Sequence, residues 1–311
     1  MIQFWSALGA LLAAAIWGFA FVVVKDSLTY ISPVYIISFR FTISVLIMAA
    51  LFWKRLKKIN KKYLWKGGLI GVFLFMAYLL QTVGCNYTTP GKNAFFTTVY
   101  VLIIPFLSWI FVKVRPKANV FIAVVIQIIG IGFLSLSEDI RQGISLNKGD
   151  ILTLLCGLFY AFQIFLQGYF SQGSEEDDPV VYAFIEFFSA GILGWLISPF
   201  YDLTTGGFTL TLQPVPFSAL SNPKVLISVL YLGIFSTAIS FTLQNFSLKY
   251  LKYSIATILL SFESVFGMLF SILIPVNGVR ERLTLGGIIG CVLIFAAVII
   301  AEKDGQGEAV Q

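Results

Sequence analysis

The chain of 311 residues has no histidine, three cysteines and few charged side chains. Charged residues form 12% of the sequence, whereas soluble domains average about 25%, so a soluble fold is nearly excluded. The lack of histidine removes the commonest metal ligand and general base. Cys85, Cys156 and Cys291 show neither metal-binding nor redox spacing and are expected to be small buried apolar residues. We therefore expect no metal site and no cofactor.

Apolar residues are abundant, at 58% of the chain with a mean hydropathy of +0.91. A hydrocarbon layer of roughly 30 Å requires about 20 apolar residues per helix. The first apolar segment lacks a basic flank before it, so we do not expect a removable signal peptide. The sequence predicts an all-α polytopic membrane protein with ten transmembrane helices, at about 5–24, 33–53, 65–84, 94–112, 119–137, 150–170, 180–200, 224–246, 253–275 and 283–301.

The 21 basic residues are divided unevenly between the predicted loops. Thirteen fall on one side of the predicted membrane, including the run "KRLKKINKK" (54–62), and seven fall on the other. The positive-inside rule then places both termini in the cytoplasm. We predict an integral, multi-pass protein of the plasma (cell inner) membrane, in contact with lipid and with no nucleic-acid partner.

The two halves of the chain resemble each other. "AYLLQTVGCNY" (77–87) aligns with "SFTLQNFSLKY" (240–250), and "SPVYIISFRF" (32–41) aligns with "DPVVYAFIEF" (178–187). Each half would hold five helices, and because five is odd the two units must be inverted relative to each other, as in many secondary transporters. The predicted divisions are a first repeat at 1–137, an extracytoplasmic connector at 138–149, a second repeat at 150–303 and a cytoplasmic tail at 304–311.

Several stretches resemble a known family. "AAAIWGFAFVVVKDSLTYISPVYIISFRF", "GKNAFFTTVYVLIIPFLSWIF" and "YLGIFSTAISFTLQNFSLKYL" look like the EamA-type transporters of the drug/metabolite transporter (DMT) superfamily. The resemblance covers nearly the whole chain as two tandem EamA units. It implies a ten-helix exporter or facilitator of small metabolites, often amino acids or related solutes.

Polar side chains recur on one face of several predicted helices. Asn93, Thr97 and Tyr100 are spaced i, i+4, i+7 and share a face, and Gln81 and Gln244 are equivalent positions of the two repeats. Polar groups in hydrocarbon need partners or water, so these faces predict a central hydrated cavity. The candidate cavity residues are Trp17, Phe21, Tyr78, Gln81, Asn93, Thr97, Tyr100, Tyr160, Gln163, Ser240, Gln244, Ser261 and Ser264.

The alternative is that these groups only join helices through hydrogen bonds. The ninth segment shows the conflict: its Ser/Thr stripe, with Ser261 and Ser264, lies off the face that carries Glu263, the repeat mate of Tyr100. The sequence leaves open which of these faces lines a cavity. Phe96 and Val99, beside the polar face of the fourth segment, are expected to face lipid.

Three ionisable side chains lie deep in predicted helices: Arg40, Glu186 and Glu263. Intramembrane charges are costly, so each is expected to have a partner or a function. Arg40 and Glu186 occupy equivalent repeat positions and could form an ion pair. Arg40 could pair with Glu263 instead, or one glutamate could exchange a proton during transport.

The sequence favours a secondary transporter that moves a small amphipathic solute, such as an amino acid, by alternating access at a midplane cavity. A nucleotide-sugar or lipid transporter on the same fold and a non-transporting membrane scaffold remain alternatives. An intramembrane enzyme is disfavoured, since the chain lacks histidine and the serine- and aspartate-protease motifs. The glycine spacings Gly67-x3-Gly71 and Gly286-x3-Gly290 could join helices within or between protomers, so the oligomeric state is left open.

Overall fold

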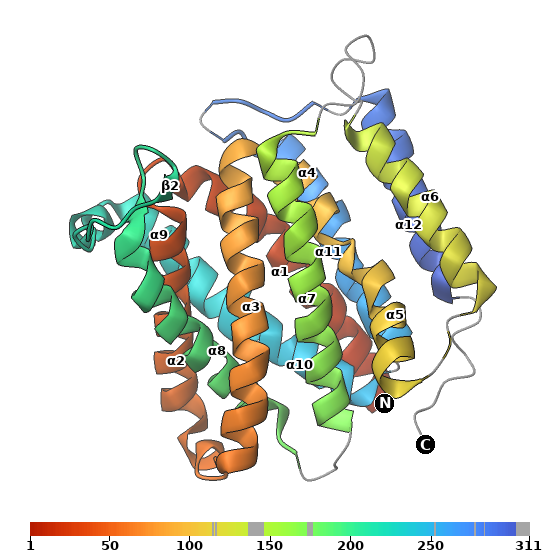
Figure 1. The fold of residues 1–311 in the computed structure, drawn as a ribbon, viewed down its shortest axis with the longest axis horizontal. Coiled ribbons are helices and arrows are strands. Elements are labelled where there is room, and N and C mark those ends of the chain that lie inside the picture. The colour runs from red at the N-terminus through yellow and green to blue at the C-terminus, as the bar shows by residue number, and fades with distance from the viewer. Residues whose placement is uncertain are drawn as a thin grey trace.

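The structure is a computed structural model that describes residues 1–113, 115, 117–135, 146–172, 177–251, 253–276, 278–282 and 284–302. The predicted tail lies wholly outside these residues, and so does most of the predicted connector. Helices form most of the described chain (Figure 1). The described strands, β1 (Tyr201–Asp202) and β2 (Gly207–Phe208), pair in a short antiparallel hairpin.

Eight helical stretches of the described chain are long and apolar enough to cross a membrane. Two shorter apolar helices accompany them, and many large apolar side chains on the helices point outward, as a lipid-facing surface requires. The chain is thus an all-α polytopic membrane protein. The helices are α1 (Ile2–Ser27), α2 (Pro33–Leu56), α3 (Lys61–Tyr87), α4 (Pro90–Thr97), α5 (Tyr100–Val112), α6 (Ala118–Ser135), α7 (Lys148–Gln172), α8 (Pro179–Ile197), the 3-10 helices η1 (Ser198–Phe200) and η2 (Phe217–Ser221), α9 (Pro223–Gly233), the π-helix η3 (Ile234–Ile239), α10 (Ser240–Tyr250), α11 (Tyr253–Leu273) and α12 (Leu285–Glu302).

A short polar residue followed by proline begins several of these helices. Thr89, Asp178 and Asn222 are the N-caps of α4, α8 and α9, and each side chain accepts a hydrogen bond from a backbone N–H of the first turn. The proline that follows has its φ angle preset for a helix and lacks an N–H that would need a partner there. The sequence thus sets where these helices enter the membrane.

Two of the long stretches are irregular near their middle. Thr98 and Val99 form a turn between α4 and α5, and Pro105 inside α5 cannot donate the backbone hydrogen bond of that turn of helix. Between α9 and α10 the chain adopts the π-helix η3. Non-helical backbone at such depth is tolerated where protein or a cavity surrounds it, so both irregularities point to the interior of the molecule.

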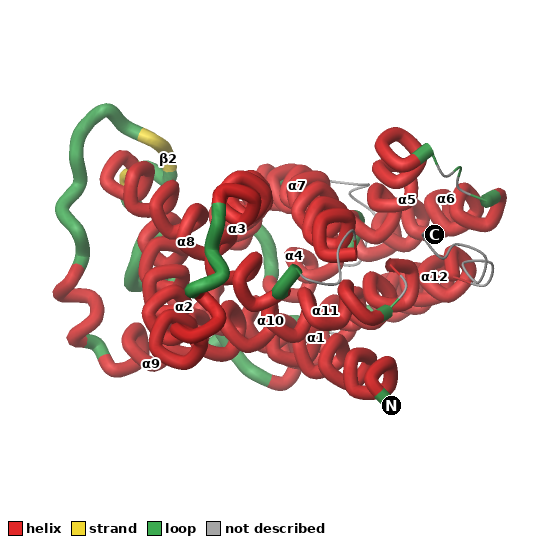
Figure 2. Tube along the Cα trace, turned by 90° about the horizontal axis from the view of Figure 1, so that it is seen from below, coloured by secondary structure: helices red, strands yellow, loops and turns green. Residues whose placement is uncertain are grey.

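The helices form a bundle around α4. Figure 2 shows α4 between the side formed by α3 and α7 and the side formed by α1 and α11, all of which it contacts. Helices α6 and α12 pack along each other at one edge (Figure 1). We call the end with the α2–α3 turn (57–60) the basic end, and the opposite end, which carries β1 and β2, the hairpin end. The N-terminus lies toward the basic end (Figure 1).

Candidate functional site

A cavity lies between the helices at mid-depth. Its empty volume is about 560 Å³, counted with its opening to solvent. Its wall takes residues from α1, α2, α3, α4, α5, α7, η3, α10 and α11. The lining residues are Trp17, Ala20, Phe21, Val24, Arg40, Tyr78, Gln81, Thr82, Cys85, Asn93, Thr97, Tyr100, Tyr160, Gln163, Ile164, Ser236, Phe241, Gln244 and Glu263.

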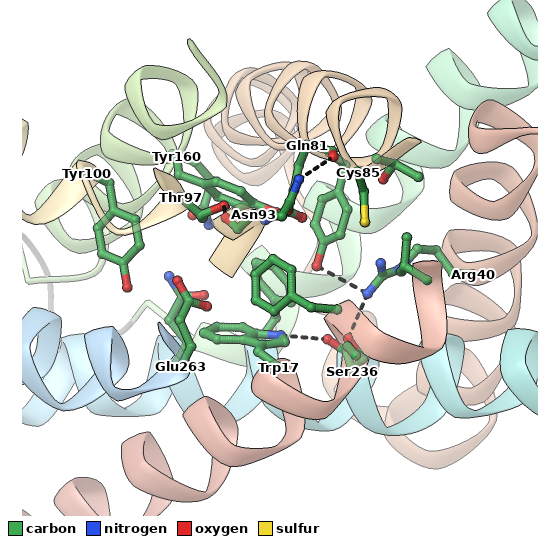
Figure 3. Close-up of a pocket in the computed structure, with 18 of the residues that line it drawn as sticks. Trp17, Arg40, Gln81, Cys85, Asn93, Thr97, Tyr100, Tyr160, Ser236 and Glu263 are labelled. Carbon is green, nitrogen blue, oxygen red and sulfur yellow. Dashed lines mark hydrogen bonds between the residues drawn. The ribbon is translucent and has the colours of Figure 1, made fainter. Parts of the chain in front are cut away.

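Hydrogen bonds between α3, α4 and α7 hold one wall of the cavity. The Gln81 Nε2 donates to Thr97 Oγ1 (3.1 Å), and Gln81 Oε1 accepts from the Tyr160 hydroxyl (3.1 Å). Asn93 Nδ2 donates to the Gln81 carbonyl (Figure 3) and also to Thr153 Oγ1. The polar face predicted on α4 therefore joins helices and lines the cavity at once.

Aromatic rings form the apolar part of the wall. Trp17 meets Phe241 edge-on with 4.9 Å between ring centroids, and its indole N–H donates to the Ser236 carbonyl (2.8 Å). Tyr160 lies edge-on to both Tyr78 and Tyr100. Such rings provide a rigid apolar surface while their polar groups remain satisfied.

Arg40 is buried at one side of this wall, with 1% of its surface exposed. Its Nε donates to Thr237 Oγ1 (2.9 Å), and its Nη2 donates to Ser236 Oγ (2.8 Å) and to the Tyr78 hydroxyl (3.2 Å). The guanidinium also lies 4.2 Å from the centre of the Tyr78 ring. Neither expected ion pair forms, since no carboxylate of the described residues lies within 4.0 Å of Arg40.

The packing of α2 against α8 explains why Arg40 and Glu186 do not pair. A Cβ on Gly194 would meet Ser38 and one on Gly191 would meet Phe41, so the two helices run antiparallel. Arg40 and Glu186 each lie seven residues, about 10 Å, from the first residue of their helix. Because those first residues lie at opposite ends of the molecule, the two charges lie at different depths.

Glu186 belongs to a separate polar cluster toward the basic end. Gln163 Nε2 donates to Glu186 Oε1 (2.7 Å), and Gln163 is the cluster member that also lines the cavity. The Asn245 amide interacts with the Glu186 carboxylate, and Gln167 Oε1 is buried without a hydrogen-bond partner in the described chain. Buried polar atoms of this kind mark places where water or a ligand enters.

Glu263 faces the cavity from the side opposite Arg40 (Figure 3). The Tyr100 hydroxyl points toward its carboxylate, and Glu263 Oε1 has no hydrogen-bond partner among the described residues. The face of α11 that carries Glu263 therefore meets the cavity. The Ser/Thr stripe of α11 does not.

Three candidate cavity residues are not on the wall: Ser240, Ser261 and Ser264. Ser240 and Ser264 each donate to a backbone carbonyl of their own helical stretch, so they satisfy themselves locally. The expectation that Phe96 faces lipid is wrong, because it is fully buried. Val99 is half-buried, and its Cγ1 packs directly against Gly157 of α7, where a larger residue would collide with it.

Some wall residues had no clear signal in the sequence. Ser236 and Phe241 reach the cavity through the π-helix, which shifts the register of the face predicted on this segment. Thr82 and Cys85 belong to the face of α3 that holds Tyr78 and Gln81, so helical spacing does place them there.

Polar contacts tie both ends of the bundle. At the basic end, Asp177 accepts from Lys62 Nζ (2.8 Å) and from the Tyr182 hydroxyl, and its carbonyl accepts from Lys249. At the hairpin end, the Glu281 carboxylate accepts from Thr89 Oγ1 (2.6 Å) and from the Gly91 N–H.

Comparison with known proteins agrees with this architecture. An uncharacterized transporter of Archaeoglobus fulgidus is 35% identical over 297 residues, which cover 95% of this chain and 85% of that protein. An uncharacterized protein of Haemophilus influenzae is 31% identical over 111 residues, 34% of this chain and 84% of that protein. A solved crystal structure superposes with a TM-score of 0.63 at 17% identity, covering 95% of this chain and 96% of that one, which shows a shared fold. The profile of the EamA-like transporter family matches residues 4–136 and 147–302, and the chain belongs to this family of membrane transporters.

Proposed function

We propose that this membrane transporter moves a small amphipathic metabolite, most simply an amino acid, across the plasma membrane by alternating access. The observation that carries the proposal is the mid-depth cavity, whose wall combines aromatic rings, amide groups and two buried ionisable side chains, the basic Arg40 and the acidic Glu263. Such a wall suits a solute with an apolar body and charged or hydrogen-bonding ends.

The proposal includes ten transmembrane helices in two inverted repeats, 1–137 and 150–303, with a connector at 138–149 and a tail at 304–311. The packing supports it, because contacts occur in sets that an internal two-fold axis would exchange. In the proposed repeats, the contact of α1 with α11 is equivalent to the contacts of α7 with α4 and α5. The contact of α3 with α7 is likewise equivalent to the contact of α10 with α1. The self-related pairs α2–α8 and α6–α12 also pack together. The proposed solute site lies between these halves.

In this arrangement the cavity extends toward the hairpin end. Val24 and Cys85 line it within one turn of the ends of α1 and α3 at that end, whereas the lining residues of α7 and α10 stop at least six residues short of the basic end of their helices. With the predicted topology, the hairpin end is extracytoplasmic. The solute would then enter or leave on that side in this conformation.

The contacts of Asp177 are proposed to keep the basic end closed. Replacing Asp177 by alanine removes the acceptor of Lys62 and Tyr182, so we expect the population open to the cytoplasm to rise. Lys62 is partly exposed and such a pair contributes about 1 kcal/mol or less, so a cysteine at position 163 should react about two- to five-fold faster from the cytoplasmic side. Asp202→Ala, at the exposed hairpin, should change nothing. Equal labelling rates in both variants would argue against this closure.

The topology can be tested in a variant whose three cysteines are replaced. New cysteines at positions 58 and 113 should react only from the cytoplasm, and those at 147 and 206 only from outside, because the basic loops remain inside. Impermeant maleimide labelling of intact cells measures this. Cytoplasmic labelling at 147 would remove the inverted-repeat proposal, since five crossings must separate it from the N-terminus.

The alternatives make different demands on the cavity. Arg40 is the single basic residue among the described lining residues. A nucleotide-sugar or a phospholipid headgroup would need several cationic side chains around its phosphates. A scaffold would bind no solute. Purified protein should therefore melt at a higher temperature with a transported amino acid, because binding to the folded state alone stabilises it. If no small metabolite raises the melting temperature or crosses proteoliposomes, the transport proposal fails.

A further inference from the structure

The charge of Arg40 is not balanced by any contact within the described chain. The side chain is 1% exposed, and its guanidinium is a cation. A buried charge without a partner is strongly unfavourable, so intramembrane cations normally pair or serve a ligand. No described carboxylate lies within 4.0 Å of it. Its contacts are three neutral hydroxyl groups and the face of one ring.

These contacts orient the guanidinium and leave part of it available. The Thr237 hydroxyl donates to the Leu232 carbonyl, so its oxygen is set to accept from Arg40 Nε. Ser236 and Tyr78 hold Nη2. In the described chain Nη1 makes no hydrogen bond, and it is absent from the fully buried polar atoms that lack a partner, so it keeps accessible surface. Its two N–H groups can therefore serve a group inside the cavity.

The surroundings limit what that group can be. Apolar rings of Trp17, Phe21 and Phe241 form much of the nearby wall, and the described wall offers a single basic residue. One guanidinium matches a singly charged, planar oxyanion. Glu263 faces the cavity from the opposite side and does not contact Arg40, so it does not occupy these donors.

We infer that the transported solute carries a carboxylate group, which Arg40 binds through Nη1 on the cavity wall. This inference rests on the proposed transport function and specifies its substrate class. The π-helix η3 is part of the site, since it brings the neighbouring residues Ser236 and Thr237 to the same guanidinium. The apolar remainder of the solute lies against the aromatic wall.

The test compares acids with their neutral amides. Proteoliposomes with the full-length protein are loaded with a panel of amino acids and aliphatic monocarboxylates, and the transported compound is then competed with its own free acid or primary amide. Wild-type protein should prefer the acid by about 10- to 100-fold, as expected for a hydrogen-bonded charge. Arg40→Lys should keep part of this preference and Arg40→Met should lose it.

Lys25→Met is the matched control, because it also removes a cation. Lys25 binds the carbonyls of Cys85, Asn86 and Thr88 at the end of α3 and is not on the cavity wall, so the acid preference should remain. Equal competition by acid and amide in the wild type, or a full acid preference in Arg40→Met, would overturn the inference while leaving transport itself intact. If Arg40→Met does not fold, the inference is judged on the acid-over-amide preference of the wild type and of Arg40→Lys. A wild type that moves no compound of the panel contradicts the proposed function instead.

Discussion

Replacing Gly71 by leucine is expected to cause a large loss of folded protein. A Cβ at this position would lie 2.5 Å from the Glu186 carbonyl oxygen and 2.7 Å from Ser189 Cβ, so α3 and α8 would have to move apart. Overpacking commonly costs about 1–3 kcal/mol, and contact with backbone places this variant at the upper end. The melting temperature in detergent should fall by on the order of 10 °C, with a lower yield.

Gly68→Leu is the control for this variant. It lies on the same helix three residues earlier, and a Cβ there meets nothing within 4 Å. Leucine is also the better helix former, so stability should be unchanged or slightly higher. A stable Gly71→Leu protein, or equal losses in both, would show that α3 and α8 do not approach as described. Gly67 also packs closely on α8, against Ile185. The Gly67-x3-Gly71 spacing therefore joins α3 and α8 within the chain.

Gln81→Leu is expected to reduce transport at least about ten-fold while changing stability little. The Gln81 amide joins Thr97 to Tyr160 at the cavity, so its removal leaves both hydroxyl groups facing the solute without their shared partner. Because the cavity gives these groups access to water or solute, the cost in melting temperature should be only a few degrees. Transport in proteoliposomes and thermal unfolding of the same preparation measure the two effects.

Two further variants sharpen this result. Gln244→Leu changes the repeat mate of Gln81, which also lines the cavity and has a buried, unpartnered Oε1, so it should impair transport as well. Val72→Ala alters an exposed residue of α3 and should leave transport unchanged. Normal transport by both glutamine variants would mean that the polar face only joins helices.

Hydropathy located the eight long apolar stretches but cut the ends of several helices short, among them α1, α2, α3 and α7. The third segment was predicted at 65–84, whereas α3 covers Lys61–Tyr87. Helices continue past the hydrocarbon into the interface, where lysine and tyrosine are favourable, and hydropathy does not register those turns. The turn at Thr98–Val99 and the π-helix η3 were not predicted either, because both depend on tertiary surroundings rather than on local composition.

Periodicity brought together most of the candidate cavity residues, from Trp17 on α1 to Gln244 on α10. It did not separate Ser261 and Ser264 from Glu263 on α11, since both faces of that helix carry polar residues. The expected pairing of Arg40 with Glu186 was wrong for a geometric reason. Helices α2 and α8 run antiparallel, so Arg40 and Glu186, each seven residues from the start of its helix, lie at different depths and do not meet.

The central claim is that solute crosses through this cavity. A single cysteine at position 24, in protein whose other cysteines are replaced, tests it most directly, because Val24 is an apolar residue that lines the cavity near the hairpin end. A small impermeant thiol reagent should block transport in proteoliposomes, and the transported solute should slow the labelling. Full transport after complete labelling, or no effect of solute on the labelling rate, would contradict the account.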